Sequence, residues 1–174
     1  SSSIAGPTIA GIPVTQRGVA ESMVLCTGVG RGGREVKVDG YDRGKTLVVL
    51  MGVARLDALI QSLLHHATSA YPSHLPIALI ERASSPDQRV ISSTLENISV
   101  ALKRLSAHRP PGMLVIGWGV MCLDGQGDMT ILDDENLAGS HERDVARVKN
   151  WVGADGYRVR EGLGEGWRRI VEGL

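Results

Sequence analysis

The segment that constrains the fold most is an apolar run that passes without a linker into a helical pattern. The run is KTLVVLM, residues 45–51, and it stops at Met51-Gly52. A short run rich in β-branched and apolar residues predicts a buried strand. In the residues that follow, apolar side chains return at helical spacing, at Val53, Leu56, Leu59, Ile60, Leu63 and Leu64. A strand followed at once by a helix that lies on the sheet indicates an α/β fold.

Similar patterns predict the other elements around this pair. A helix of small residues is expected over residues 1–10, and a further helix is expected after Thr94 as its cap, with Ile98, Leu102 and Leu105 on its apolar face. Buried strands are expected at 22–28, 76–83, 89–92 and 113–123, the last as one strand with a bulge or as two segments. This order predicts a mixed, mostly parallel sheet flanked by helices.

The character of the sequence changes after Leu123. Residues 1–123 are predicted to form the α/β domain, and residues 124–174 are predicted to form an extension that is partly helical or disordered. Weak amphipathic stretches around Val145–Val152 and Trp167–Val171 indicate its helical parts. At the other end, SSSIAGPTIAG looks like the middle of a helix, so we expect the chain to be a piece of a longer protein.

Composition limits the partners that the chain can hold. The 19 basic and 19 acidic residues among 174 balance to a formal net charge of zero, so no long-range field favours nucleic acid or an anionic membrane. No apolar run reaches the roughly 18 residues of a membrane span. Cys26 and Cys122 lie in separate apolar runs and are expected to be buried thiols in a reducing compartment. The histidines show no metal-ligand spacing, so no metal site is expected.

The glycine-rich stretch GVGRGG, residues 28–33, matches the spacing of a dinucleotide-binding loop. Such a loop needs a helix directly behind it, because the helix N-terminus holds the phosphates. The following residues, REVKVDGYDRG, have no helical stripe. A flexible surface loop is therefore the default interpretation.

Three strand-end residues suggest a binding pocket. Met51, Ala83 and Gly112 each lie beside a predicted strand, and ligands of open α/β sheets bind outside strand ends. Small side chains let a ligand approach the backbone, and a polarisable thioether can lie against a purine ring. The alternative is that Met51 is a core residue at a helix start. No catalytic dyad or nucleophile motif accompanies the three residues.

Four ordered segments closely resemble the C-terminal half of uroporphyrinogen-III C-methyltransferases, which belong to the tetrapyrrole methylases. The segments are AGIPVTQRGVAESMVLCTG, TLVVLMGVARLDALIQSLL, IALIERASSPDQRVISSTLENI and PPGMLVIGWGV. The resemblance runs from Ser1 to about Leu123. The remaining residues are similar to extensions of fungal members of the family.

The resemblance implies a two-domain enzyme that binds S-adenosyl-L-methionine in the cleft between its domains. The enzyme methylates uroporphyrinogen III twice to give precorrin-2, on the way to sirohaem. The N-terminal domain, which is missing here, is expected to hold the catalytic residues, so none is assigned in this chain. The resemblance also implies a homodimer in the full enzyme and a cytoplasmic location. Its implied cofactor contacts are Ser1, Ser2, Met51, Ala83 and Gly112.

Arg17 is the one residue assigned to the substrate, because its guanidinium can pair with a propionate of a tetrapyrrole. The sequence departs from the family at Gln16, where the family has His, at Arg82, where it has Asn, and at Trp118, where it has Glu. These departures leave two alternatives open. The chain is then either a non-catalytic truncated module that retains the fold, or a related methylase with another substrate, such as a different precorrin or a protein side chain.

Overall fold

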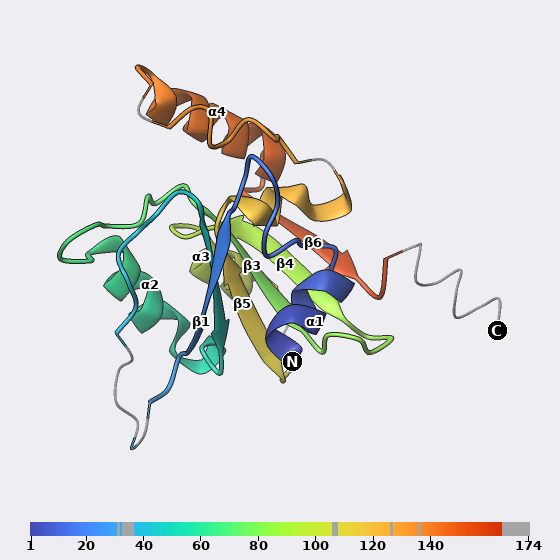
Figure 1. The fold of residues 1–174 in the computed structure, drawn as a ribbon. Coiled ribbons are helices and arrows are strands. Elements are labelled where there is room, and N and C mark those ends of the chain that lie inside the picture. Colours follow the sequence, from blue (N-terminus) through green and yellow to red (C-terminus); the bar gives the residue numbers. More distant parts are fainter. Residues whose placement is uncertain (31, 33–36, 106–107, 126, 136, 165–174) are drawn as a thin grey trace.

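A six-stranded sheet forms the centre of the chain, in the order β1-β2-β5-β3-β4-β6 (Figure 1). The structure is a computed structural model that describes residues 1–30, 32, 37–105, 108–125, 127–135 and 137–164. The strands are β1 (Ser22–Thr27), β2 (Lys45–Leu50), β3 (Pro76–Glu81), β4 (Arg89–Thr94), β5 (Gly112–Ile116) and β6 (Tyr157–Glu161). The α-helices are α1 (Ser2–Ile9), α2 (Leu56–Leu64), α3 (Ile98–Arg104) and α4 (Ser140–Val152), and the 3₁₀ segments are η2 (Val53–Arg55) and η3 (Trp118–Gly125).

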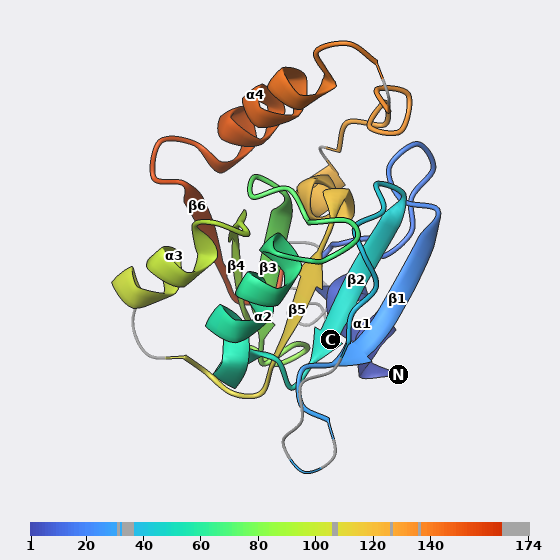
Figure 2. The ribbon, with the colours of Figure 1, turned by 90° about the vertical axis from the view of Figure 1, so that its left-hand side faces the viewer.

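The helices cover both faces of the sheet. Helices α2 and α3 lie on one face and α1 on the other, whereas α4 lies toward the end of the sheet where β2 begins (Figures 1 and 2). Two apolar clusters match this arrangement, because successive strand side chains point to opposite faces. Leu47 and Val49 of β2 join the cluster with α2, and Val48 between them joins the cluster below α1. The predicted helices on a mixed sheet are therefore confirmed.

The prediction that the sheet is mostly parallel is wrong. Among the strands of the described residues, only the β1–β2 pair is parallel, and the pairs β2–β5, β5–β3, β3–β4 and β4–β6 are antiparallel. Strands β3 and β4 are joined by the short loop 82–88, and two neighbouring strands with so short a link must run in opposite directions. Apolar runs in the sequence show where strands lie but not in which direction they run.

Several local predictions also need correction. Thr94 is the last residue of β4 rather than a helix cap, and Asn97 precedes α3. Residues 118–125 form η3 rather than a strand, since Gly117 turns the chain with φ of 136°. Strand β1 is half-exposed rather than buried, because it lies at the edge of the sheet.

Strand β6 was not predicted from the sequence. Its residues, YRVRE, include three charged side chains and pair with the outer edge of β4. The amphipathic stretch 145–152 is helical as part of α4, and the stretch 167–171 lies outside the described residues. A domain boundary after Leu123 remains a prediction.

A buried ion pair attaches α4 to the rest of the chain. The Arg43 guanidinium donates two hydrogen bonds to the Asp144 carboxylate, at 2.6 and 2.9 Å. The two side chains are only 9% and 5% exposed, and Arg43 also lies 4.9 Å above the Trp118 ring centroid. The geometry is bidentate, which is the strong form of this pairing.

Two further observations concern the membrane and the thiols. Among the residues that the structure describes, no helix is long and apolar enough to cross a membrane. Cys26 and Cys122 are free thiols, the first half-buried and the second buried, and burial raises the pKa of both.

We expect Asp144→Ala to lower the free energy of unfolding by roughly 3 kcal/mol, because it leaves the Arg43 charge buried without its partner. Urea denaturation at pH 7 measures this. Lys45→Ala is the matched control, since Lys45 pairs with Asp42 at an exposed site and should cost less than about 1 kcal/mol. Equal losses of unfolding free energy in the two variants would contradict the assignment of Arg43 and Asp144 as a buried ion pair.

Candidate functional site

The pairing register brings the ends of three strands to one edge of the sheet. Met113 lies opposite both Leu50 of β2 and Ile80 of β3, and Gly112 lies opposite Glu81. We call residues 50–52, 81–84 and 110–113 the strand-end edge. Met51, Ala83 and Gly112 all belong to it, so the structure brings together the three residues that were predicted to share a pocket. Their contacts with a cofactor remain a prediction.

Met51 points away from the core. Its side chain is 64% exposed, so the alternative of a core methionine is wrong. Its backbone has φ of 56°, in the left-handed region that L-residues avoid. Two other residues of the edge share this strain, Arg82 with φ of 49° and Ser84 with φ of 70°. Within the described ranges these are the non-glycine residues with positive φ, and strained backbone gathers at binding and catalytic sites.

Helix α1 packs against the strand-end edge because Gly6 has no side chain. A Cβ at Gly6 would lie 2.5 Å from the terminal methyl of Met113 and 3.6 Å from the Cβ of Ala83. Ser1 and Ser2, at the start of this helix, are exposed. In both views the N-terminus lies at the end of the sheet where β1 and β2 finish (Figures 1 and 2). The role of the two serines as cofactor contacts remains a prediction.

The first glycine of GVGRGG has a packing role that sequence analysis missed. A Cβ at Gly28 would lie only 2.4 Å from the Cα of Gly52, and the Gly28 N–H donates to the Leu50 carbonyl at 2.7 Å. Gly28 therefore lets the ends of β1 and β2 approach each other. Residues 37–44 are not helical, as expected, and residues 31 and 33–36 lie outside the described part of the chain.

The strand-end edge includes a buried carboxylate. Glu81 is fully buried and accepts hydrogen bonds from Arg89 Nε at 2.5 Å and from the Arg109 backbone N–H at 2.8 Å. The His108 ring Nδ1 lies 2.6 Å from the same carboxylate. Burial alone would raise the pKa of Glu81, but these hydrogen bonds outweigh burial and lower it. The carboxylate thus stays charged and joins β3, β4 and the residues before β5.

Sequence analysis did not identify this network. One signal was present, since Glu81 ends an otherwise apolar strand and Arg89 begins the next. Opposite charges at the two ends of a short loop are expected to meet when the strands pair. His108 gave no comparable signal, because it lies 27 residues away in the sequence.

Arg17 lies in the turn between Gln16 and Ala20, on the loop after α1. The neighbouring residues 11–16 line a surface cavity of about 500 Å³ together with Thr8 and Cys122. Gln16, at the position where His was expected, donates to the Met129 sulfur at 2.8 Å. Arg17 itself is exposed, beside this cavity, and its pairing with a substrate carboxylate remains a prediction.

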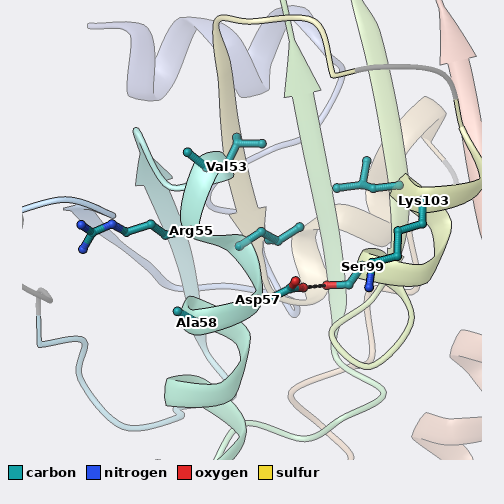
Figure 3. Close-up of a pocket in the computed structure, with 9 residues that line it drawn as sticks. Val53, Arg55, Asp57, Ala58, Ser99 and Lys103 are labelled. Atoms are coloured by element: carbon teal, nitrogen blue, oxygen red, sulfur yellow. Dashed lines mark hydrogen bonds between the residues drawn. The ribbon is translucent and has the colours of Figure 1, made fainter.

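A second cavity, of about 480 Å³, lies between α2 and α3 (Figure 3). Val53 lines it, and the Val53 methyl lies 3.2 Å from where a Cβ at Gly112 would be, so the cavity adjoins the strand-end edge. Asp57 accepts a 2.5 Å hydrogen bond from Ser99 across it, and Arg55 and Lys103 lie at its border. Sequence analysis did not predict this cavity. No group of three metal-ligating side chains occurs among the residues described.

Met51 offers a test of the strained backbone. Met51→Gly is expected to change the free energy of unfolding by less than about 1 kcal/mol, because relief of the left-handed conformation offsets the greater freedom of glycine in the unfolded chain. Met51→Val is expected to cost about 2 kcal/mol, because a β-branched residue tolerates positive φ poorly. Urea denaturation compares the two, and equal stability of both variants would be inconsistent with the observed φ.

Glu81 offers a test by pH. Its pKa is lower in the folded chain than the ordinary value of 4.5, so its contribution to stability is present above pH 4.5 and is lost as the pH falls through the folded-state pKa. Glu81→Gln is expected to cost roughly 3 kcal/mol at pH 7, because the buried Arg89 guanidinium loses the negative charge of Glu81. The difference in the free energy of unfolding between this variant and the unmodified chain should become smaller below pH 4.5. Urea denaturation at several pH values measures it. A difference that stays constant would refute a charged Glu81.

Comparisons with known proteins connect this geometry to a family. A profile of the tetrapyrrole (corrin/porphyrin) methylases matches residues 1–99. The chain is 42% identical over 118 residues to a probable uroporphyrinogen-III C-methyltransferase of Schizosaccharomyces pombe, covering 68% of this chain and 23% of that protein. It is 39% identical over 128 residues to the uroporphyrinogen-III C-methyltransferase of Methanocaldococcus jannaschii, covering 72% and 52%.

A solved structure agrees with these matches. The uroporphyrin-III C-methyl transferase of Thermus thermophilus, complexed with S-adenyl homocysteine, superimposes with a TM-score of 0.54 at 34% identity. The match covers 64% of this chain and 46% of that one. The chain thus spans between about a quarter and a half of the length of these relatives. Together, the profile match and the shared sheet confirm the resemblance: the chain belongs to the tetrapyrrole (corrin/porphyrin) methylase family.

Proposed function

We propose that this chain supplies one wall of the cofactor site of an S-adenosyl-L-methionine-dependent uroporphyrinogen-III C-methyltransferase. The full enzyme would methylate uroporphyrinogen III to precorrin-2 in sirohaem biosynthesis. The observation that carries the proposal is the meeting of Met51, Ala83 and Gly112 at one sheet edge, in a chain similar to proteins of that name.

The residues of the strand-end edge fit an adenosine group. Its rim combines the exposed thioether of Met51 with the small residues Ala83 and Gly112, and such residues leave room for a flat ring beside the backbone. Ser1 and Ser2 add hydroxyl groups from the start of α1. When bound, S-adenosyl-L-methionine supplies the methyl group from its sulfonium. The part of this chain is to bind and orient that group and to exclude water on one side.

Substrate binding and proton transfer are proposed to come from residues outside the strand-end edge. Arg17 would pair with a carboxylate of the tetrapyrrole, because a guanidinium offers two parallel donors to a carboxylate. Proton transfer would come from an N-terminal domain that packs on this one, and the full enzyme would be a cytoplasmic homodimer. The proposal therefore gives this chain cofactor binding and does not give it turnover on its own.

Two departures from the family favour a second candidate, a non-catalytic module that retains the fold. Trp118, at the position of the family's Glu, is 1% exposed and donates from its ring N–H to the Tyr41 hydroxyl at 3.0 Å. Gln16 bonds to Met129. Both residues have structural partners within the chain, so neither needs a substrate to explain it. A related methylase with another substrate is a third candidate, and the same departures on the substrate side favour it.

We expect the chain to bind S-adenosylhomocysteine and Met51→Asp to weaken that binding at least about tenfold, because a carboxylate would replace an apolar contact with the ring. Isothermal titration calorimetry measures both dissociation constants. Val100→Asp is the control, since Val100 is also exposed but lies on α3.

Each outcome favours one candidate. Binding that Met51→Asp weakens and Val100→Asp leaves intact supports the cofactor wall. Absence of binding by the unmodified chain would contradict the proposal and support the non-catalytic module.

A further inference from the structure

We infer that β6 positions the two loops that carry Ala83 and Gly112, so that a strand beyond residues 1–99 of the family match shapes the strand-end edge. Only the expected effect on cofactor binding rests on the proposed function. Three links carry it, and all start from residues 160–162, at the end of β6.

The first link is an ion pair to the loop before Gly112. The Glu161 carboxylate accepts two hydrogen bonds from the Arg109 guanidinium, at 2.7 and 3.2 Å. The backbone N–H of the same Arg109 donates to buried Glu81 at 2.8 Å. Arg109 is therefore held at two points, its backbone by a carboxylate inside the chain and its side chain by β6. Gly112 follows three residues later.

The second link reaches the loop of Ala83. The Gly162 N–H, just after β6, donates to the Gln88 carbonyl at 2.6 Å. Gln88 is fully buried, and its side-chain carbonyl accepts from the Ser84 backbone N–H at 3.0 Å. Ser84 and Arg82, the two residues that flank Ala83, both have positive φ. The end of β6 thus holds the loop that fixes Ala83.

The third link reaches α1. The Arg160 side chain donates to the Ala10 carbonyl at the end of this helix, at 2.5 Å. Helix α1 packs on Ala83 and Met113 through Gly6. The same strand therefore contacts residues that adjoin the edge on three sides, namely Arg109, Gln88 and Ala10. Strand β2 has no such link and joins the edge by pairing with β5.

The Glu161–Arg109 pair is suited to positioning rather than to holding the fold. Its side chains are 55% and 33% exposed, so solvent screens the interaction and its loss should leave the core intact. The pair acts directly on residues 109–113, and the Arg82 backbone N–H donates to the Pro111 carbonyl there, so the loop 82–88 responds with it. Such a modest interaction changes the populations of loop conformations more than it changes global stability.

The test is amide hydrogen exchange of the free chain. Glu161→Ala is expected to speed exchange about three- to fivefold in residues 82–88 and 109–113, while the amides of α2 exchange as before. Glu161→Gln keeps one acceptor and should give a smaller effect. Glu142→Ala is the matched control, because Glu142 is an exposed carboxylate on α4. Unchanged exchange in both loops of Glu161→Ala would overturn the inference.

Titration with S-adenosylhomocysteine separates this inference from the proposed function. Glu161→Ala should weaken binding by about three- to fivefold, while its denaturation midpoint matches that of Glu142→Ala. If Glu161→Ala speeds loop exchange but leaves the affinity for S-adenosylhomocysteine unaltered, the effect of β6 on cofactor binding at the strand-end edge is overturned. The unmodified chain could fail to bind S-adenosylhomocysteine while Glu161→Ala still speeds amide exchange in the two loops. The proposed function would then fail, and the positioning of the loops by β6 would stand.

Discussion

Strand β5 runs antiparallel to both of its neighbours, and this pairing decides what the strand-end edge contains. Because β5 runs opposite to β2 and β3, its first residue lies beside their last ones. Gly112 is that first residue, so a residue without a side chain lies between the strand ends that carry Met51 and Ala83. A parallel β5 would instead have placed Ile116 there, followed by Gly117 and Trp118. The direction of one strand thus puts a glycine at this edge rather than Ile116 or Trp118.

The Glu81 carboxylate fixes the loops around that edge. A buried charge is costly unless it is well paired, and here three donors from two segments surround it. An apolar side chain could fill the same volume, but it would hold neither Arg89 nor the residues before β5. The charge therefore holds both segments in place at this edge.

The sequence revealed part of this arrangement, and the reasons for success and failure are physical. The apolar run before Met51 and the stripe after it were predicted well, because both signals are local. Met51, Ala83 and Gly112 were placed together because strand ends can be located from patterns and from family resemblance. Strand direction and the Glu81 network depend on which strands pair, and pairing is not a local property. Strand β6 was missed because Tyr157–Glu161 carries the charged side chains of a polar surface segment.

The cover that β6 gives to β4 has a consequence for shortened versions of the chain. Strand β4 is buried along its whole length, and its outer backbone groups are paired with β6. A chain cut back to Leu123 would leave those N–H and C=O groups bare beside Val90 and Ile91. Such an edge is a template for joining a second molecule strand to strand. The last strand would then decide whether the domain stays dispersed in solution or precipitates into aggregates.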